Sequence, residues 1–229
     1  MDWKKYWDNN AANDDPFVQV ERYIKNEPLD TKTISEISAY IINTLKIQLH
    51  ETVLDICCGN GLLTKLLSQH CQHIYGFDFS GAQIENAKAN NNAENITYEV
   101  ADALLSSKQF VQKADKILLY FSFQYFDTFR KGKKVITEAA KLLNNGGMML
   151  IGDIPAKEHL WKFYKTPKDK MRYLKNNVLN KNPMGKFWSK EELDKICDKL
   201  NLDGIYLQQS DHLPYSSYRF DYLIKMKNS

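Results

Sequence analysis

The sequence lacks the features of secreted, metal-binding and membrane-spanning chains. It has four cysteines in 229 residues, and no CxxC pair or His/Cys cluster. A disulfide framework or a tetrahedral metal site is therefore not expected. No apolar run approaches the roughly 18–20 residues that span a bilayer, and the amino terminus is charged from its second residue, unlike a signal peptide. We expect a reduced, cytoplasmic protein with no metal and no membrane partner.

The chain also has little net charge. The chain has 31 Lys and Arg against 28 Asp and Glu, a net charge of +3, far below that of a strongly basic nucleic-acid-binding domain. Hydrophobic residues make up 43% and charged residues 26%, as in an average globular protein. Composition thus predicts one ordinary globular domain, and function has to be inferred from motifs.

Short apolar runs alternate with amphipathic segments from residue 52 onward. We expect strands at 52–57, 73–79, 96–101, 115–121, 147–153, 204–209 and 218–226. We expect helices at 62–68, 82–90, 104–112, 133–144 and 189–200, with a helix stop and turn at 144–147. Alternation of this kind predicts an α/β fold with a doubly wound, mostly parallel, seven-stranded sheet.

The ends of the chain depart from this alternation. Residues 1–50 predict a helical cap, with a short amphipathic piece that opens at Phe17 and ends near Pro28, and a longer helix over 33–49. Residues 155–188 form an insertion, and 189–229 supply a last helix and two strands. We therefore expect a single domain over 1–229 with residues 51–154 as its core.

The insertion is strongly basic. Between residues 155 and 186, eight Lys and Arg172 stand against only Glu158 and Asp169, a local net charge of +7, with four aromatic residues interspersed. Long connections after the strands of a parallel sheet lie at the strand carboxyl ends, where ligands bind. The segment is either a solvated basic helix pair or a lid over an anionic substrate.

The strongest motif is the stretch 55–61, which reads Asp-Ile-Cys-Cys-Gly-Asn-Gly and opens a helix at Leu62. Small residues there let the backbone turn sharply against a ligand. The spacing is not the G-x-G-x-x-G of dinucleotide-binding proteins, because no third glycine follows Gly61. Asp55 would also repel a pyrophosphate and suits a cationic ligand. A dinucleotide-dependent oxidoreductase is therefore disfavoured.

Acidic residues end three successive expected strands. They are Asp55, Asp78 and Asp102. Asp78 is placed to accept hydrogen bonds from two vicinal ribose hydroxyls, as an acidic residue does in nucleotide sites. Each aspartate alone could be a loop cap, but three in register indicate a ligand site at one edge of the sheet.

These motifs resemble the class I S-adenosylmethionine-dependent methyltransferases of the small-molecule type. The likeness extends over about residues 50–155 and includes 55–61, Asp78, Asp102-Ala103, 114–125 and 143–147; residues 218–224 are similar to the antiparallel last strand of that family. Cys57 stands where the family usually has glycine. The resemblance implies S-adenosyl-L-methionine as cofactor, residues 51–154 as the cofactor-binding core, and a cap that closes over it.

The resemblance also implies which residues contact the cofactor. Asp55 would lie near its ammonium, Asp78 would bind the ribose, and Asp102 would accept from the adenine amino group. The full implied set is Asp55, Cys57, Gly59, Asn60, Gly61, Asp78, Phe79, Asp102, Ala103, Phe121 and Ser122, with Gln19 from the cap.

The methyl acceptor is less defined by the sequence. Residues 119–122 read Leu-Tyr-Phe-Ser, unlike the Asn/Asp-Pro-Pro-Tyr/Phe of family members that methylate adenine or glutamine amides. We expect a small anionic acceptor, such as a nucleotide sugar or a carboxylate. Nucleic acid is a less favoured partner: an RNA methyltransferase using 155–186, or a non-catalytic cofactor-binding partner protein, remains the alternative.

An oxygen acceptor has to lose a proton, which calls for a positioned base. His159 is our candidate because imidazole titrates near neutrality, and Tyr125 is a second. The expected substrate-binding residues are Tyr6, Gln124, Tyr164 and Arg172.

Overall fold

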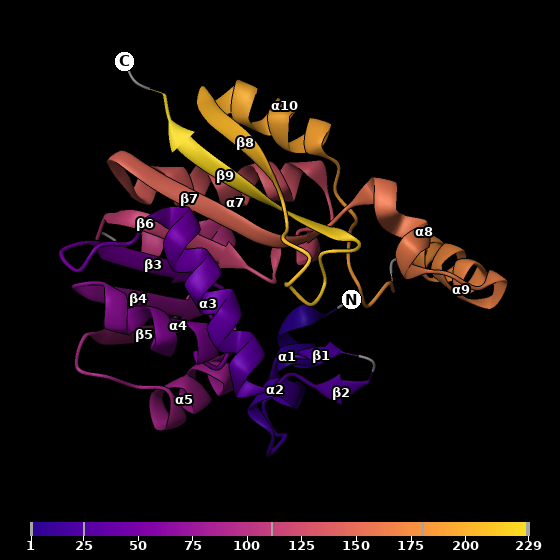
Figure 1. The fold of residues 1–229 in the computed structure, drawn as a ribbon, viewed down its shortest axis with the longest axis horizontal. Helices are drawn as coiled ribbons and strands as arrows, with labels where there is room; N and C mark the ends of the chain where they lie inside the picture. Colours follow the sequence, from indigo (N-terminus) through magenta and orange to yellow (C-terminus); the bar gives the residue numbers. More distant parts are fainter. Residues whose placement is uncertain (1, 25, 111, 180, 228–229) are drawn as a thin grey trace.

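A seven-stranded sheet forms the centre of the computed structural model, which describes residues 2–24, 26–110, 112–179 and 181–227 (Figure 1). The strand order is β5-β4-β3-β6-β7-β9-β8; β9 is antiparallel to both of its neighbours and the pairs from β5 to β7 are parallel. The strands are β3 (Thr52–Ile56), β4 (His73–Asp78), β5 (Ile96–Val100), β6 (Ala114–Tyr120), β7 (Leu143–Pro155), β8 (Leu202–Gln208) and β9 (Arg219–Met226). The predicted doubly wound sheet is confirmed.

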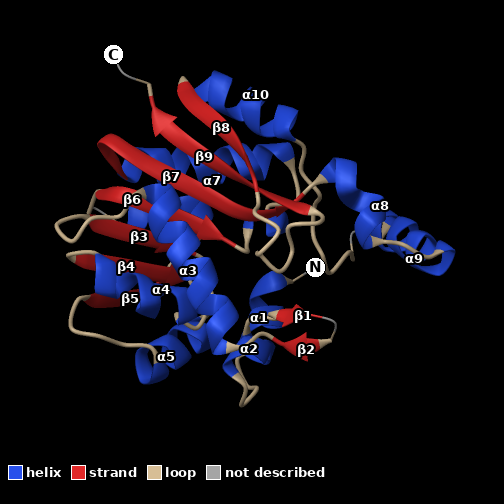
Figure 2. Ribbon diagram, viewed as in Figure 1, coloured by secondary structure: helices blue, strands red, loops and turns tan. Residues whose placement is uncertain are grey.

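Helices cover both faces of this sheet (Figure 2). Alternate residues of β6 point to opposite sides: Ile117 belongs to the core under α7 and α10, whereas Leu118 belongs to the core under α3 and α4. Burial on both faces explains why the central strands β3 and β6 are mostly apolar, whereas the edge strand β5 contains exposed Glu99. The covering helices are α3 (Thr31–Leu45), α4 (Leu62–Leu67), α5 (Gly81–Asn90), α6 (Ser106–Gln109), α7 (Phe129–Leu142) and α10 (Lys190–Leu200).

The amino-terminal cap is not wholly helical. It contains α1 (Trp3–Asn10) and α2 (Pro16–Gln19), and then a hairpin of β1 (Tyr23–Ile24) and β2 (Glu27–Pro28). The expected amphipathic piece therefore stops early, because Glu21 takes a φ of 52°, which no helix continues. The long helix is α3, which Asp30 caps and which ends before Lys46 at φ 53°.

Two further boundaries differ from expectation. The turn expected at 144–147 is part of β7, which begins at Leu143 and absorbs the glycines through a register shift opposite Ala114 and Lys116. The helix expected at 104–112 is split into a 3-10 helix, η2 (Ala103–Leu105), and α6; residue 111 lies outside the described residues.

The basic insertion forms two helices, α8 (Leu160–Phe163) and α9 (Pro167–Val178), after the 3-10 helix η4 (Lys157–His159). They project from the body of the domain (Figure 1). We call the pair α8 and α9 the basic arm. The Tyr164 and Tyr173 rings pack against each other at a tilt, with centroids 4.8 Å apart, and the Tyr164 hydroxyl donates to Asn182 Oδ1 at 3.0 Å. None of the described helices combines the length and the apolar character needed to cross a bilayer.

Candidate active site

The carboxyl ends of the parallel strands surround a cavity of about 220 Å³, here called the first cavity. Most of its walls come from the ends of β3, β4, β5 and β6 and the loops that follow them. The rest comes from the cap, from Gln83 of α5 and from Lys131 of α7. The sequence-predicted residues that line it are Cys57, Gly59, Asp78, Phe79, Asp102, Ala103, Phe121, Ser122 and Tyr125, joined by Trp3, Trp7, Val20 and Arg22 from the cap.

Asp78 joins two of these loops. Its Oδ2 accepts a hydrogen bond from the Gly59 main-chain nitrogen at 3.1 Å, and its Oδ1 accepts one from the Ser80 nitrogen at 2.9 Å. Burial raises the pKa of this carboxyl to about 6, although the main-chain donors act in the opposite direction. Each oxygen has a second lone pair, so the carboxylate retains acceptor capacity toward the cavity.

Backbone strain is concentrated at the same strand ends. Cys57 after β3, Phe121 after β6 and Asp153 near the end of β7 have φ values of 61°, 65° and 59°. Each left-handed non-glycine residue costs roughly 1–3 kcal/mol, and such residues gather at functional sites. Cys57 is the position where the related family usually has glycine, and it adopts the conformation that a glycine there would favour.

Asp55 lies beside the first cavity rather than in its wall. It lines a smaller third cavity of about 50 Å³, together with Asn60 and residues shared with the first cavity. Its Oδ2 accepts a hydrogen bond from Thr64 Oγ1 at 2.6 Å. Burial raises the pKa of Asp55 to about 7, so a cationic ligand group nearby would favour its ionised form.

Side-chain amides fasten the cap onto the core. Asn60 Nδ2 donates to the main-chain oxygen of Pro16 and to Gln19 Oε1, each at 2.8 Å, and Gln83 Nε2 donates to the Gln19 main-chain oxygen at 2.8 Å. Gln19 Nε2 donates to the Asn13 oxygen. Gln19 lines none of the three cavities, because its amide nitrogen and its amide oxygen both make hydrogen bonds within the cap or between cap and core.

Gly61 likewise lies outside the cavity walls. It opens α4 with a φ of 79°, and a Cβ there would come within 2.4 Å of the Tyr98 hydroxyl oxygen. Glycine is thus needed for close packing of the helix start. The cofactor-binding roles assigned to Gln19 and Gly61 gain no support from their positions.

The second cavity, of about 420 Å³, lies between the cap and the basic arm. All four residues expected to bind substrate, Tyr6, Gln124, Tyr164 and Arg172, line it. Tyr125 and Arg22 belong to the walls of both the first and the second cavity, so the two cavities meet at these side chains.

Tyr125 is held by the aromatic residues of the cap. Its ring centroid lies 4.5 Å from that of Trp3 and 5.5 Å from that of Trp7. Burial raises the Tyr125 pKa, against an opposing effect of Arg22, so the hydroxyl is protonated at neutral pH. It can donate a hydrogen bond there. His159 lies in η4 and lines none of the three cavities, so its catalytic role stays a prediction.

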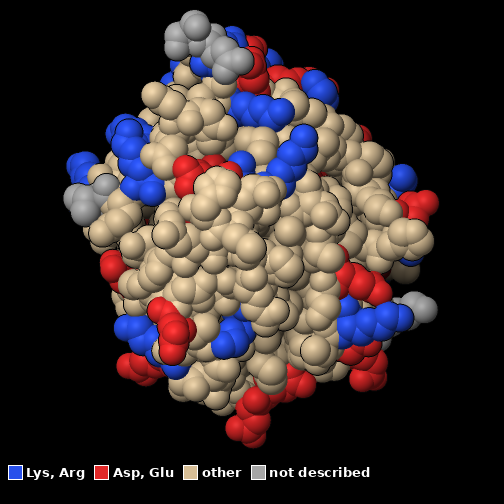
Figure 3. All heavy atoms as spheres, turned by 60° about the vertical axis from the view of Figure 1, so that its left-hand side comes forward, with Lys and Arg blue, Asp and Glu red and all other residues tan. Residues whose placement is uncertain are grey.

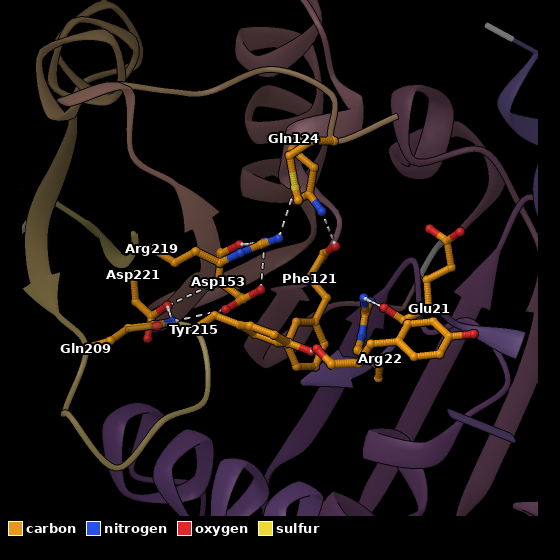
Figure 4. A network of polar contacts seen from close by, with 11 residues as sticks. Glu21, Arg22, Phe121, Gln124, Asp153, Gln209, Tyr215, Arg219 and Asp221 are labelled. Atoms are coloured by element: carbon orange, nitrogen blue, oxygen red, sulfur yellow. Dashed lines mark hydrogen bonds and ion pairs between the residues drawn. The ribbon is translucent and has the colours of Figure 1, made fainter. Parts of the chain in front are cut away.

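Two arginines of the site were missed by sequence reasoning. Arg22 lines all three cavities, and its guanidinium carbon lies 4.0 Å from the centroid of the Phe121 ring. Arg219 lines the second cavity and pairs with Asp153 (Figure 4). Arg22 belongs to no sequence motif, and Arg219 was noted only as part of an expected strand. Both arginines line the second cavity because the cap and the last strand meet there.

A doubly wound sheet with a cavity at the carboxyl ends of its strands is typical of α/β domains that bind nucleotide-like ligands. Comparison with known proteins shows which family of such domains this chain belongs to. A family model described as a methyltransferase domain matches residues 47–203. The malonyl-[acyl-carrier protein] O-methyltransferase of Acetivibrio thermocellus is 23% identical over 225 residues, 97% of this chain and 72% of that protein.

Solved structures show the same fold. The N-methyltransferase NodS from Bradyrhizobium japonicum, in complex with S-adenosyl-L-homocysteine, has a TM-score of 0.64 at 15% identity, over 100% of both chains. The magnesium protoporphyrin IX methyltransferase of Synechocystis, also with that product bound, has a TM-score of 0.64 at 16% identity, over 98% of both chains.

The chain belongs to the methyltransferase domain family, since that family's model covers well over half of it. S-adenosylmethionine is the cofactor of this family. The family, the enzyme class and the cofactor that the motifs predicted are thereby confirmed.

Proposed function

We propose that this protein transfers a methyl group from S-adenosylmethionine in the first cavity to a small anionic acceptor in the second. The observation that carries the proposal is the meeting of the two cavities at Tyr125 and Arg22. A donor and an acceptor bound on either side of this point would have their reacting groups adjacent, which is the main requirement for a direct displacement.

The residues of the first cavity fit the cofactor. Asp78 is a buried carboxylate with acceptor capacity for a ribose diol. Ser122 Oγ, which is buried in the wall, has no hydrogen-bond partner among the described residues. Asp102 Oδ1 accepts from the Leu104 nitrogen at 2.9 Å, and its other oxygen is free to accept from an adenine amino group. Phe79 supplies an apolar surface for the base.

The methionine end would lie toward the third cavity. Asp55 and Arg22 both line that cavity, so they offer a carboxylate to an ammonium group and a guanidinium to a carboxylate. When bound, the cofactor supplies an electrophilic methyl group on a sulfonium. The cap, fastened by Asn60 and Gln83, excludes water from that methyl group.

The charges of the second cavity favour an anionic acceptor. Arg22, Arg172 and Arg219 line it with one carboxylate, that of Glu21, which accepts a hydrogen bond from the Tyr6 hydroxyl. Outside this lining, Arg172 pairs with Asp169 and Arg219 pairs with Asp153. Arg22 has no carboxylate within 4.0 Å among the described residues. An acceptor with a carboxylate or phosphate is therefore the best match.

The RNA alternative rests on the basic arm alone. The face shown in Figure 3, turned away from the basic arm, has scattered Lys and Arg side chains beside Asp and Glu and does not extend the arm into a continuous basic track. A backbone-binding protein presents such a track. Arg22 and Arg219 instead line the second cavity, which suits a small molecule better.

Formation of S-adenosylhomocysteine tests this proposal. The protein is incubated with S-adenosylmethionine and separate pools of nucleotide sugars, sugar acids and short RNA. We expect turnover with an anionic small-molecule pool and its loss in Asp78→Ala. Turnover with RNA only would contradict the proposed acceptor, and absence of turnover together with absence of cofactor binding would contradict the proposed reaction.

A further inference from the structure

Arg219 is a buried guanidinium whose hydrogen-bond donors are only partly used. The residue is 6% exposed, and its guanidinium carbon lies 5.3 Å from the ring centroids of both Tyr215 and Tyr218. Nη1 donates to the Asp153 main-chain oxygen at 2.6 Å and pairs with its Oδ2 at 2.7 Å (Figure 4). Nη2 meets only the Met184 sulfur, at 3.3 Å, and Nε has no partner among the described residues.

Neutralisation of buried carboxylates explains only part of this arrangement. An arginine that served Asp153 alone could offer it two parallel N–H groups, the usual two-pronged geometry. Here the Asp153 carboxylate pairs with one nitrogen. The second buried carboxylate, Asp221, is not paired with Arg219; it accepts from the Asp153 nitrogen at 2.6 Å and from Gln209 Nε2 at 2.8 Å.

This network fixes the orientation of Arg219. Asp221 and Gln209 hold the left-handed backbone at Asp153, and Asp153 in turn holds Nη1. Among the described residues, the remaining edge of the guanidinium, Nη2 and Nε, makes no hydrogen bond to an oxygen atom, and the Tyr218 hydroxyl is the oxygen that adjoins the guanidinium. Arg219 and Met184 both line the second cavity. A thioether sulfur is a weak acceptor, and buried donors are seldom left without an oxygen partner.

Gln124 provides the complementary group in the same cavity. It is 2% exposed, and its Nε2 donates to the Phe121 oxygen at 2.8 Å. Its Oε1 is buried and accepts no hydrogen bond from the described residues. The Gln124 main-chain oxygen accepts from the Lys186 nitrogen at 2.8 Å, which ties the loop carrying Met184 to this wall.

We propose that Arg219 and Gln124 recognise a methyl acceptor that carries an oxyanion beside a hydroxyl group. The oxyanion, a carboxylate or a phosphate, accepts from the free edge of Arg219, and the hydroxyl donates to Gln124 Oε1. Sugar acids and sugar phosphates combine both groups, whereas a neutral sugar or a simple fatty acid has one of them. This inference rests on the proposed function, because it assigns the second cavity to the acceptor.

Met184 offers a matched pair of variants. Met184→Glu places a carboxylate against Arg219 Nη2 and so occupies the site, and Met184→Gln is a neutral change of nearly the same size. The residue is only half-buried, so both variants are expected to fold, which thermal melting checks. Arg219→Gln tests the guanidinium directly, but it removes the partner of a buried aspartate.

Calorimetry on the full-length protein saturated with S-adenosylhomocysteine measures binding of five probes: glucuronate, glucose, glycerol phosphate, glycerol and propionate. We expect glucuronate or glycerol phosphate to bind at least about tenfold more tightly than its neutral counterpart and than propionate. The preferred anion distinguishes carboxylate from phosphate recognition. Met184→Glu should weaken that binding at least about tenfold and Met184→Gln less than about threefold.

If Met184→Glu and Met184→Gln bind the preferred anion with equal affinity, the proposal is overturned. It is also overturned if the wild-type protein binds neither glucuronate nor glycerol phosphate. Titration with S-adenosylhomocysteine separates this result from failure of the proposed function. If the product binds and the anions do not, the acceptor site alone is wrong. If the product does not bind either, the methyltransferase reaction itself is contradicted.

Discussion

Asn60 in the loop after β3 donates a hydrogen bond from its side-chain nitrogen to the side-chain oxygen of Gln19, 41 residues earlier in the chain, at 2.8 Å. The same nitrogen also donates to the main-chain oxygen of Pro16. The loop that resembles the methyltransferase motif is therefore fastened directly to the cap that covers the first cavity. We therefore expect cofactor binding and closure of the cap to be coupled through this pair.

Substitution of Asn60 tests the coupling. Asn60→Asp removes the donor of both hydrogen bonds and places a carboxylate against two oxygens. Two hydrogen bonds of about 1 kcal/mol each predict a loss of affinity for S-adenosylhomocysteine of about tenfold or more. Limited proteolysis should cleave the cap faster. Asn177→Asp, the same change on the exposed side of α9, is the control, and equal behaviour of the two variants would contradict the coupling.

Cofactor affinity should depend on pH through Asp78. Its pKa is raised to about 6 by burial, and ribose binding needs the ionised carboxylate as an acceptor. Affinity for S-adenosylhomocysteine should therefore fall as the pH decreases through 6, by up to about tenfold per pH unit below it. Protonation of Asp55, whose pKa is about 7, should lower the affinity for S-adenosylhomocysteine at a higher pH than protonation of Asp78 does.

Asp78→Asn separates the two contributions in the same titration. This variant should bind more weakly at pH 8, keep the decrease near pH 7 and lose the one near pH 6. An affinity that stays constant from pH 8 to pH 5 in the wild-type protein would show that neither carboxylate contacts the ligand.

Asp55 should limit stability at alkaline pH. Its pKa in the folded protein is about 7, above the ordinary value of 3.8, so the stability linked to its protonated form is fully present below about pH 3.8 and is lost as the pH rises through 7. Asp55→Asn can still accept from Thr64 Oγ1. The variant should melt at a higher temperature than the wild type at pH 8, with a smaller difference at pH 5.

The cofactor titration provides the complementary readout for Asp55→Asn, which should lose affinity while it gains stability. Melting at a lower temperature than the wild type at pH 8 would mean that the charged carboxylate has a stabilising partner, and the account of its burial would be wrong.

Tyr125 and His159 should respond differently to substitution. Tyr125→Phe keeps the ring that packs on Trp3 and Trp7, so cofactor affinity should be unchanged. Loss of a hydroxyl that acts in proton transfer or orientation should lower kcat by about 100-fold, a typical effect for such a group. His159→Ala, which changes a residue outside the three cavities, should keep nearly full turnover. The reverse outcome would restore His159 as the base and remove Tyr125.

The fold could be predicted from the sequence because the patterns that specify each helix and strand lie within short segments of the chain. Apolar runs and helix caps specify each element, and the parallel order follows from their alternation. The location of a ligand site at the strand ends could also be predicted, since Asp78 and Asp102 lie at the ends of strands that finish at one edge of the sheet. The four residues expected to bind the methyl acceptor line one cavity because the cap, the segment after β6 and the basic arm meet at that edge.

What the sequence could not give depends on tertiary contacts. Arg22 and Arg219 come from opposite ends of the chain. No local signal distinguishes Arg22 from a surface arginine, and the strand expected at 218–226 does not show that Arg219 faces a cavity. Gln19 was predicted to contact the cofactor, but whether its amide faces a ligand or Asn60 depends on the path of the cap. The hairpin of β1 and β2 was missed because its strands have two residues each, too short for any periodicity.

Calorimetric titration with S-adenosylmethionine and S-adenosylhomocysteine, with NADH as a control, tests the central claim most directly. The account predicts micromolar binding of both sulfur compounds, no binding of NADH, and loss of binding in Asp78→Ala. Binding of NADH, or undiminished binding of S-adenosylhomocysteine by Asp78→Ala, would contradict the assignment of the first cavity as the cofactor site.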